Sequence, residues 1–241
     1  MIGYSKKSTV EEIKERFDND VERFANLDTG QKTTIDAALC LDLITDAALY
    51  VNKNAADVLD IGCGAGNYTV KMLTKLPSLN CTLIDLSLPM LERAHSRVSN
   101  KTSGEVHILQ SDIRSVNFEE GKFDVIMAGA VLHHLRDDSD WEFVFTKIYS
   151  WLKPGGSFWI SDLIEHDSEA INKLFVKQYG DYIENLGGAD YRKHVLDYVQ
   201  KEDSPRSLTY QLDLMRKVGF TFTEVLHKNM CFAAFGGVKL G

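Results

Sequence analysis

The chain has 241 residues, of which 44% are hydrophobic and 26% are charged. This composition is typical of a globular chain of one domain with an added segment, and no apolar run reaches the ~18 residues of a membrane-spanning helix. The net charge of −8 argues against nucleic acid or an anionic membrane as partner, because proteins that bind these usually present a basic face. The four cysteines form no CxxC pair and the first residues carry no apolar signal segment, so we expect no disulfide and a cytoplasmic location.

Two amphipathic helices are expected over residues 9–24 and 33–50, where apolar residues recur at three- and four-residue steps. Residues 1–54 are therefore assigned to an N-terminal helical cap. Strands and helices then alternate. The expected strands cover 56–61, 81–85, 105–110, 123–128 and 156–164, and the expected helices cover 66–76, 88–100 and 138–151. This alternation predicts a parallel sheet with helices on both faces, so residues 55–167 are interpreted as a Rossmann-like, doubly wound α/β core.

The alternation stops at residue 167. Helical patterns over 168–187 and 189–201 predict a helical insertion at 168–207. Because ligands bind at the carboxyl ends of the strands in this architecture, we expect the insertion to form a lid over that edge of the sheet. A last helix and two strands, at 222–227 and 231–238, lie within 208–241. They are expected to complete a mostly parallel seven-stranded sheet with an antiparallel C-terminal hairpin.

The most informative motif lies at residues 58–69, where an apolar strand ends in Asp60 and glycines follow at positions 62, 64 and 66. A strand, a tight glycine turn and a helix bring bare backbone close to a nucleotide-like ligand. The dinucleotide fingerprint G-x-G-x-x-G requires its last glycine at position 67, where this chain has Asn67. The motif therefore favours a ligand without a phosphate and argues against a nicotinamide-dependent dehydrogenase.

Residues 60–66, Asp-Ile-Gly-Cys-Gly-Ala-Gly, resemble motif I of the class I S-adenosylmethionine-dependent methyltransferases. Further elements that are similar to this family follow in the required order, at residues 83–87, 110–113, 123–135 and 152–156. The resemblance covers residues 55–165. It implies S-adenosylmethionine as the cofactor and S-adenosylhomocysteine as the product.

Each part of S-adenosylmethionine requires a different chemical group. Its amino-acid tail needs backbone donors and a carboxylate, its ribose diol needs a carboxylate that accepts two hydrogen bonds, and adenine needs an acceptor beside an apolar slot. Gly129 is expected to leave room for the ligand. The residues expected to bind the cofactor are Asp60, Gly62, Cys63 and Gly64 at the tail, Asp85 at the diol, Leu86, Met90, Asp112 and Ile113 at adenine, and Gly129.

His133 and His134 follow the fourth expected strand, at the edge of the expected methyl position. Either histidine is suited to take a proton near neutral pH, so both are candidate catalytic residues. We expect no metal site, because adjacent residues point in different directions and no carboxylate–histidine spacing completes one. In the expected lid, an aromatic and basic cluster makes Tyr179, Tyr182 and Arg192 candidate substrate-binding residues.

These features predict a methyltransferase that acts on a small molecule, without identifying the acceptor. The layout also distantly resembles the carboxy-S-adenosylmethionine synthases, which modify the ligand itself and in which an arginine of the helical insertion meets the added carboxylate. Arg192 lies near the matching place, but Gly129 stands where that family has an asparagine. A binding module without catalytic activity is the third hypothesis. A homodimer is also left open, because the N-terminal helices either cover the pocket or meet a second subunit.

Overall fold

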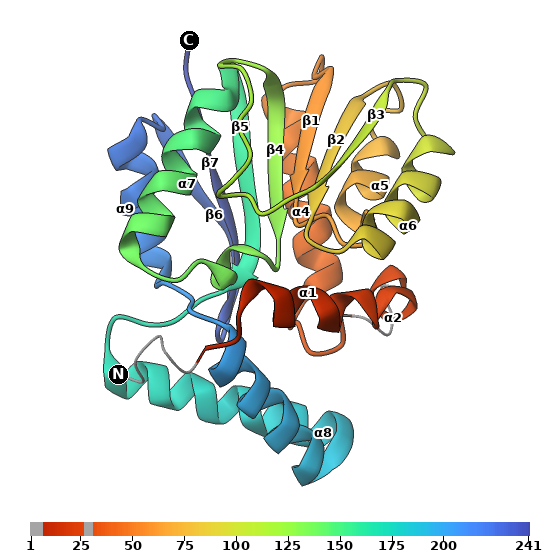
Figure 1. The fold of residues 1–241 in the computed structure, drawn as a ribbon. Coiled ribbons are helices and arrows are strands. Elements are labelled where there is room, and N and C mark those ends of the chain that lie inside the picture. Colours follow the sequence, from red (N-terminus) through yellow and green to blue (C-terminus); the bar gives the residue numbers. More distant parts are fainter. Residues whose placement is uncertain (1–6, 27–30) are drawn as a thin grey trace.

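The computed structural model describes residues 7–26 and 31–241. Its centre is a seven-stranded sheet in the order β3-β2-β1-β4-β5-β7-β6 (Figure 1). The parallel strands are β1 (Asp57–Ile61), β2 (Asn80–Asp85), β3 (Val106–Gln110), β4 (Phe123–Gly129) and β5 (Leu152–Leu163). Strand β7 (Phe232–Val238) runs antiparallel to both β5 and the edge strand β6 (Phe222–Asn229). The predicted doubly wound, mostly parallel sheet with an antiparallel C-terminal hairpin is confirmed.

Helices cover both faces of the sheet because alternate side chains of each strand point to opposite faces. Leu59 and Ile126 belong to one buried cluster, to which α7 and α9 contribute, whereas Val58 and Val125 belong to another with α4, α5 and α6. Each fully buried aliphatic side chain of these clusters stabilises the fold by roughly 1.5–3 kcal/mol. The helices are α4 (Ala37–Val51), α5 (Asn67–Leu73), α6 (Leu88–Ser99), α7 (Asp138–Trp151) and α9 (Leu208–Val218).

Side-chain caps fix the bounds of the helices that flank the core strands. The carboxylate of Asp137 accepts a hydrogen bond of 3.0 Å from the backbone N–H of Asp140, so α7 begins where the pattern predicts. Ser87 caps α6 in the same way, by accepting from the N–H of Met90, and Pro89 occupies the first turn. Local signals of this kind explain why the predicted core helices lie close to the observed ones.

The N-terminal segment differs from its prediction. Instead of one helix over 9–24, α1 (Val10–Asp18) and α2 (Val21–Ala25) are separated by a break at positions 19–20. The next helix, α4, begins at position 37 rather than 33, because Asp36 adopts a left-handed conformation with φ of 56°. The Asp36 carboxylate accepts hydrogen bonds of 2.8 Å from His227 and Asn229 on β6, and these contacts hold the residue in place.

Strand β5 differs from its prediction, whereas the helical segment after it has the predicted break. Strand β5 begins at position 152 rather than 156, and the expected turn lies inside it as a bulge with φ of 80° at Gly155. Helix α8 (Glu169–Glu202) is interrupted by Gly188, at the predicted glycine pair. It lies beyond the carboxyl edge of the sheet, and α1 and α2 lie between the sheet and α8 (Figure 1). Within the described part of the chain, no helix combines the length and apolar character needed to span a membrane.

Candidate active site

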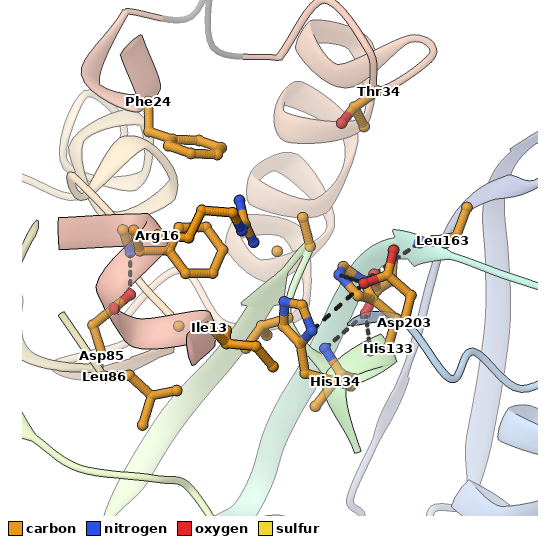
Figure 2. A pocket seen from close by; sticks show the side chains of 18 of the residues that line it. Ile13, Arg16, Phe24, Thr34, Asp85, Leu86, His133, His134, Leu163 and Asp203 are labelled. Carbon is orange, nitrogen blue, oxygen red and sulfur yellow. Dashed lines mark hydrogen bonds and ion pairs between the residues drawn. The ribbon is translucent and has the colours of Figure 1, made fainter. Parts of the chain in front are cut away.

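A cavity of about 690 Å³ lies at the carboxyl ends of β1, β2 and β4 (Figure 2). This volume is typical of pockets that enclose a small molecule. The strand-end loops form part of its wall, and helices α1 and α8 complete it. The residues that α1 and α8 contribute are Val10, Ile13, Arg16, Phe17, Tyr179, Tyr191, His194, Val195, Tyr198 and Val199.

The loop between β1 and α5 forms one end of the cavity. Gly62, Gly64 and Gly66 have φ of 62°, 50° and 80°, a conformation that glycine adopts without strain. A side-chain carbon at Gly62 would lie 2.4 Å from a methyl group of Val131, so the turn has no room for alanine there. Apart from Gly64 itself and its two chain neighbours, no described residue has a heavy atom within 4 Å of the place that a Cβ of Gly64 would take. The backbone of this turn is therefore accessible to a ligand.

The carboxylate of Asp85 lines the cavity at the end of β2. It accepts hydrogen bonds from the backbone N–H groups of Gly64, at 2.8 Å, and Ser87, at 2.9 Å. Burial raises the pKa of Asp85, and these hydrogen bonds act against the rise. A carboxylate with four acceptor positions retains capacity for two hydroxyl groups, which is the chemistry that a ribose diol requires.

Most of the other predicted cofactor residues also line the cavity. The carboxylate of Asp112 lines it and is paired with Arg114 at 2.6 Å. Burial acts to raise the pKa of Asp112, but Arg114 outweighs burial and lowers that pKa. Gly129 also lines the cavity, yet a Cβ there would lie 2.2 Å from the ring of Tyr68, which occupies the expected free space. Cys63, Leu86, Met90 and Ile113 complete the predicted residues in the wall.

Asp60 is an exception, because it does not line the cavity. Its side chain is 1% exposed, and one carboxylate oxygen accepts hydrogen bonds from the hydroxyl of Thr69, at 2.6 Å, and from the N–H of the same residue. Burial raises the pKa of Asp60 to about 7. The structure thus places this carboxylate beneath the glycine turn, where it connects β1 to α5, rather than beside the ligand.

Both predicted catalytic histidines line the cavity, in a short 3-10 turn (η2, Leu132–His134) after β4. Nδ1 of His133 bonds to the carboxylate of Asp162, which also accepts from two backbone N–H groups of the turn. Burial lowers the pKa of His133, but the carboxylates of Asp162 and Asp203 outweigh it and raise that pKa to about 9.

His134 behaves in the opposite way. Its burial, together with the charge of His133, holds the pKa of the His134 imidazole well below its usual range. At neutral pH His133 is therefore already protonated and His134 is a weak base. These environments differ from the expectation that either histidine accepts a proton near neutral pH.

Asp203 was not predicted from the sequence to belong to the site. It follows the last residue of α8 and is 5% exposed, with one carboxylate oxygen 3.6 Å from both His133 Nε2 and His134 Nδ1. The two neighbouring histidines thus converge on one carboxylate, contrary to the expectation that they point in different directions. Arg16 of α1 was missed as well. It lines the cavity and bonds to Glu202 at 2.9 Å and to the hydroxyl of Tyr198 at 2.7 Å.

The predicted substrate residues of α8 separate into two groups. Tyr179 lines the cavity, and its hydroxyl donates a hydrogen bond to the carbonyl of Thr33. Tyr182 and Arg192 do not line this cavity. The Arg192 guanidinium is instead paired with Asp181, at 3.0 Å, and Glu184, at 2.8 Å, on the segment of α8 that precedes the break at Gly188.

Comparison with known proteins decides the family. The family model described as a methyltransferase domain matches residues 58–156. The chain is 30% identical over 172 residues to the demethylmenaquinone methyltransferase of Lactococcus lactis subsp. lactis (strain IL1403), and the match covers 69% of this chain and 66% of that relative. The chain belongs to the class I S-adenosylmethionine-dependent methyltransferase family.

Other relatives of this methyltransferase differ in activity. A carboxy-S-adenosyl-L-methionine synthase of Vibrio atlanticus (strain LGP32) is 25% identical over 194 residues, which are 78% of each chain. Among solved structures, the 1,6-didemethyltoxoflavin-N1-methyltransferase of Burkholderia thailandensis, with bound 1,6-didemethyltoxoflavin and S-adenosylhomocysteine, has a TM-score of 0.62. It is 17% identical, over 97% of this methyltransferase and 92% of that chain, and at this identity the likeness shows the shared fold.

Proposed function

We propose that this methyltransferase binds S-adenosylmethionine at the glycine turn and transfers its methyl group to a small molecule. The observation that carries the proposal is one cavity that connects the turn and Asp85 to an aromatic region under α1 and α8. When bound, S-adenosylmethionine supplies an electrophilic methyl group on a sulfonium sulfur. The aromatic residues at the other part of the cavity are Phe17, Phe24, Tyr179, Tyr191, Tyr198 and Phe232.

The residues at the turn fit this cofactor. The open backbone at Gly64 leaves space for a ligand, and the half-buried Asp85 retains acceptor positions for the ribose hydroxyls. The carboxylate of Asp112 and the apolar side chain of Ile113 lie along the same wall, in keeping with adenine. We infer that Gly62, Cys63 and Gly64 meet the amino-acid tail.

The cover over the cavity supports a small acceptor. Arg16 joins α1 to α8 through Glu202 and Tyr198, and both helices line the cavity. This contact works against the entry of a polymeric acceptor. The net charge of −8 also works against binding of a nucleic acid.

Carboxy-S-adenosylmethionine synthesis is the second candidate, because a relative of that name matches 78% of this chain. The environment of Arg192 argues against it. That guanidinium is held by Asp181 and Glu184 outside the cavity wall, so it is not placed to meet a carboxylate beside the cofactor.

Two measurements test the proposal. Calorimetry with S-adenosylmethionine, S-adenosylhomocysteine and NAD should show binding of the first two ligands only. A panel of small phenols, quinols, amines and carboxylic acids should then include an acceptor that releases S-adenosylhomocysteine and gains the mass of one methyl group. If the protein binds neither S-adenosylmethionine nor S-adenosylhomocysteine, the proposal is wrong. Mass spectrometry of co-purified ligand separates the second candidate, because an added carboxylate changes the ligand mass.

A further inference from the structure

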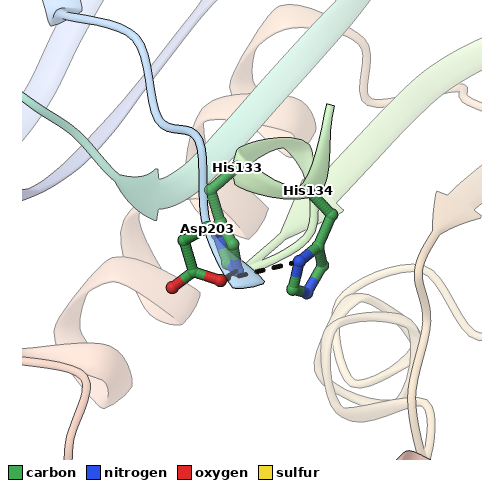
Figure 3. A group of neighbouring side chains, drawn as sticks. All are labelled: His133, His134 and Asp203. Atoms are coloured by element: carbon green, nitrogen blue, oxygen red, sulfur yellow. Dashed lines mark ion pairs between the residues drawn. The ribbon is translucent and has the colours of Figure 1, made fainter. Parts of the chain in front are cut away.

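Three side chains converge on one point of the cavity wall: His133, His134 and Asp203 (Figure 3). One carboxylate oxygen of Asp203 lies 3.6 Å from Nε2 of His133 and 3.6 Å from Nδ1 of His134. One ligand atom from each residue lies within 4.8 Å of the other two. The two histidines come from the turn after β4 and the aspartate from the end of α8, so the tertiary fold creates the cluster.

Two of the three atoms that face one another in this cluster, Oδ1 of Asp203 and Nδ1 of His134, have no hydrogen-bond partner among the described residues. Among the described residues, Oδ1 of Asp203 and both ring nitrogens of His134 are buried without a partner at hydrogen-bond geometry. Each unsatisfied buried polar atom destabilises the folded state, because it has lost its hydrogen bonds to water without replacement. One shared proton gives a partner to only two of these atoms, whereas a cation with several coordination positions binds all three residues at once. The arrangement therefore favours a bound cation.

The surroundings of His133 have the form of a metal-binding histidine. Its Nδ1 bonds to Asp162, and this carboxylate is itself fixed by the backbone N–H groups of Leu132, at 2.8 Å, and Leu163, at 2.7 Å. A carboxylate on one ring nitrogen fixes the ring orientation and directs the other nitrogen toward the metal. Here the other nitrogen, Nε2, faces Asp203.

We propose that His133, His134 and Asp203 bind a divalent transition-metal ion in the cavity wall. The ion displaces the proton that Nε2 of His133 carries in its absence, and this proton leaves to solvent. Two imidazoles and one carboxylate suit Zn²⁺, Fe²⁺ or Co²⁺ better than Mg²⁺ or Ca²⁺, which prefer oxygen ligands. Bonds of about 2.0–2.2 Å place neighbouring ligand atoms roughly 3–3.5 Å apart. Binding therefore requires the three ligand atoms, which lie within 4.8 Å of one another, to move closer together. Three protein ligands leave coordination positions open toward the cavity.

This site deepens the proposed methyl transfer and rests on it for its role. An acceptor hydroxyl bound at an open position of the ion has a lowered pKa and loses its proton to solvent. The acceptor oxygen then forms a bond to the methyl carbon as the sulfur–carbon bond breaks, and that electron pair stays on sulfur. A metal-bound oxygen makes a general base unnecessary at the moment of transfer.

Metal binding is tested on the full chain after dialysis against a chelator, without cofactor or acceptor. Titration with Zn²⁺ followed by calorimetry should show one ion bound per chain. Titration with Co²⁺ should give visible absorption bands of a nitrogen- and oxygen-ligated ion. A thiolate-to-cobalt charge-transfer band would instead show binding at a cysteine and would overturn the assignment, as would the absence of any stoichiometric binding.

Variants assign the ligands. His134→Ala and Asp203→Asn should each weaken Zn²⁺ binding by at least about 100-fold, and the supporting change Asp162→Asn by about 10–100-fold. His227→Ala is the matched control, because His227 also pairs with a carboxylate, Asp36, but lies outside the cavity wall. Circular dichroism verifies that each variant is folded. If His134→Ala binds Zn²⁺ as the wild type does, the site is wrong.

The outcomes separate this inference from the proposed function. Ion binding is measured without S-adenosylmethionine, and cofactor binding is measured on the chelator-treated protein. Methyl transfer that proceeds at the full rate after chelation removes the metal proposal and leaves the methyltransferase intact. If the chain binds the ion but does not bind S-adenosylmethionine, the proposed function is wrong and the metal site stands.

Discussion

The backbone N–H of Gly64 donates a hydrogen bond of 2.8 Å to the carboxylate of Asp85, 21 residues further along the chain. The parallel pairing of β1 with β2 makes this contact possible. It aligns Ile61 with Ile84, so the glycine turn after β1 and Asp85 at the end of β2 lie at the same edge of the sheet. The glycine turn and the carboxylate are therefore held together before a ligand arrives. A ligand that contacts both meets a preorganised pair.

Replacement of this carboxylate should weaken cofactor binding. Asp85→Asn removes the negative charge that strengthens hydrogen bonds from ribose hydroxyls, and it turns an amide N–H₂ toward a backbone donor. We expect S-adenosylhomocysteine to bind at least about tenfold more weakly, as measured by calorimetry. Asp46→Asn is the control, because Asp46 on α4 lies outside the cavity wall and pairs with Lys75. Equal affinity of the Asp85 variant and the wild type would contradict the ribose assignment.

Because Asp85 is titratable, we expect the binding of S-adenosylhomocysteine to depend on pH. Burial raises the pKa of Asp85, so protonation on acidification begins at a higher pH than for an ordinary carboxyl. Protonation removes the charge that accepts the hydroxyls. The affinity for S-adenosylhomocysteine should therefore be full above the raised pKa and fall as the pH is lowered through it. Calorimetry between about pH 8 and about pH 5 measures the effect, and the asparagine variant should lack this part of the pH dependence. An identical pH profile for both proteins would show that another group is responsible.

Most of the fold could be predicted from local signals, and the exceptions have long-range causes. The alternation of strands and helices and the cap at Asp137 are properties of neighbouring residues, and they gave the correct sheet and α7. The late start of α4 depends on Asp36, whose left-handed conformation is held by His227 and Asn229 on the last hairpin. No pattern within the first 50 residues contains that information.

The candidate site divides in the same way. The wall formed by the glycine turn and Asp85 could be predicted, because both follow parallel strands whose ends meet at one edge. Asp203 and Arg16 could not, because they come to the cavity from α8 and α1 through tertiary packing. Arg192 has the side-chain type that a substrate pocket needs, but it pairs with two carboxylates of α8 across the break at Gly188.

Gly129→Ala should disturb both stability and binding through one neighbour. The new methyl group would lie 2.2 Å from the ring of Tyr68, which would have to move. Such overpacking costs about 1–3 kcal/mol of unfolding free energy, measured by urea denaturation. A double-mutant cycle provides the control, since Gly129→Ala should cost clearly less in a Tyr68→Ala background. Additive effects of the two changes would show that the ring is not the obstacle.

Thr69→Val should destabilise the fold through the buried carboxylate beneath the turn. Asp60 would lose the hydroxyl donor at 2.6 Å and keep only the backbone N–H, at 3.2 Å. We expect a loss of about 1–3 kcal/mol when Asp60 is ionised. Because burial raises the pKa of Asp60 to about 7, the loss should be larger above this pH than well below it, where the carboxyl is protonated. Thr74→Val is the control, since its hydroxyl donates to a carbonyl at the exposed end of α5. A loss that does not depend on pH would contradict the role given to Asp60.

The contact of Arg16 with the end of α8 should control how often the cavity opens. Its guanidinium bonds to Glu202 through two nitrogens, at 2.9 and 3.1 Å, and to the hydroxyl of Tyr198. The Glu202 side chain is only 8% exposed, so Arg16→Gln leaves a nearly buried carboxylate without its cation. We expect hydrogen exchange in α1 to become about 5- to 100-fold faster, corresponding to about 1–3 kcal/mol, and ligand release to become faster with it. Arg23→Gln is the matched control, because Arg23 also lines the cavity but forms its ion pair with Asp20, three residues away, rather than with a carboxylate of α8. Since Arg16→Lys keeps the charge but loses the two-nitrogen contact, it should give an intermediate rate. Equal exchange of α1 in the Arg16→Gln and Arg23→Gln variants would mean that apolar packing alone closes the cavity.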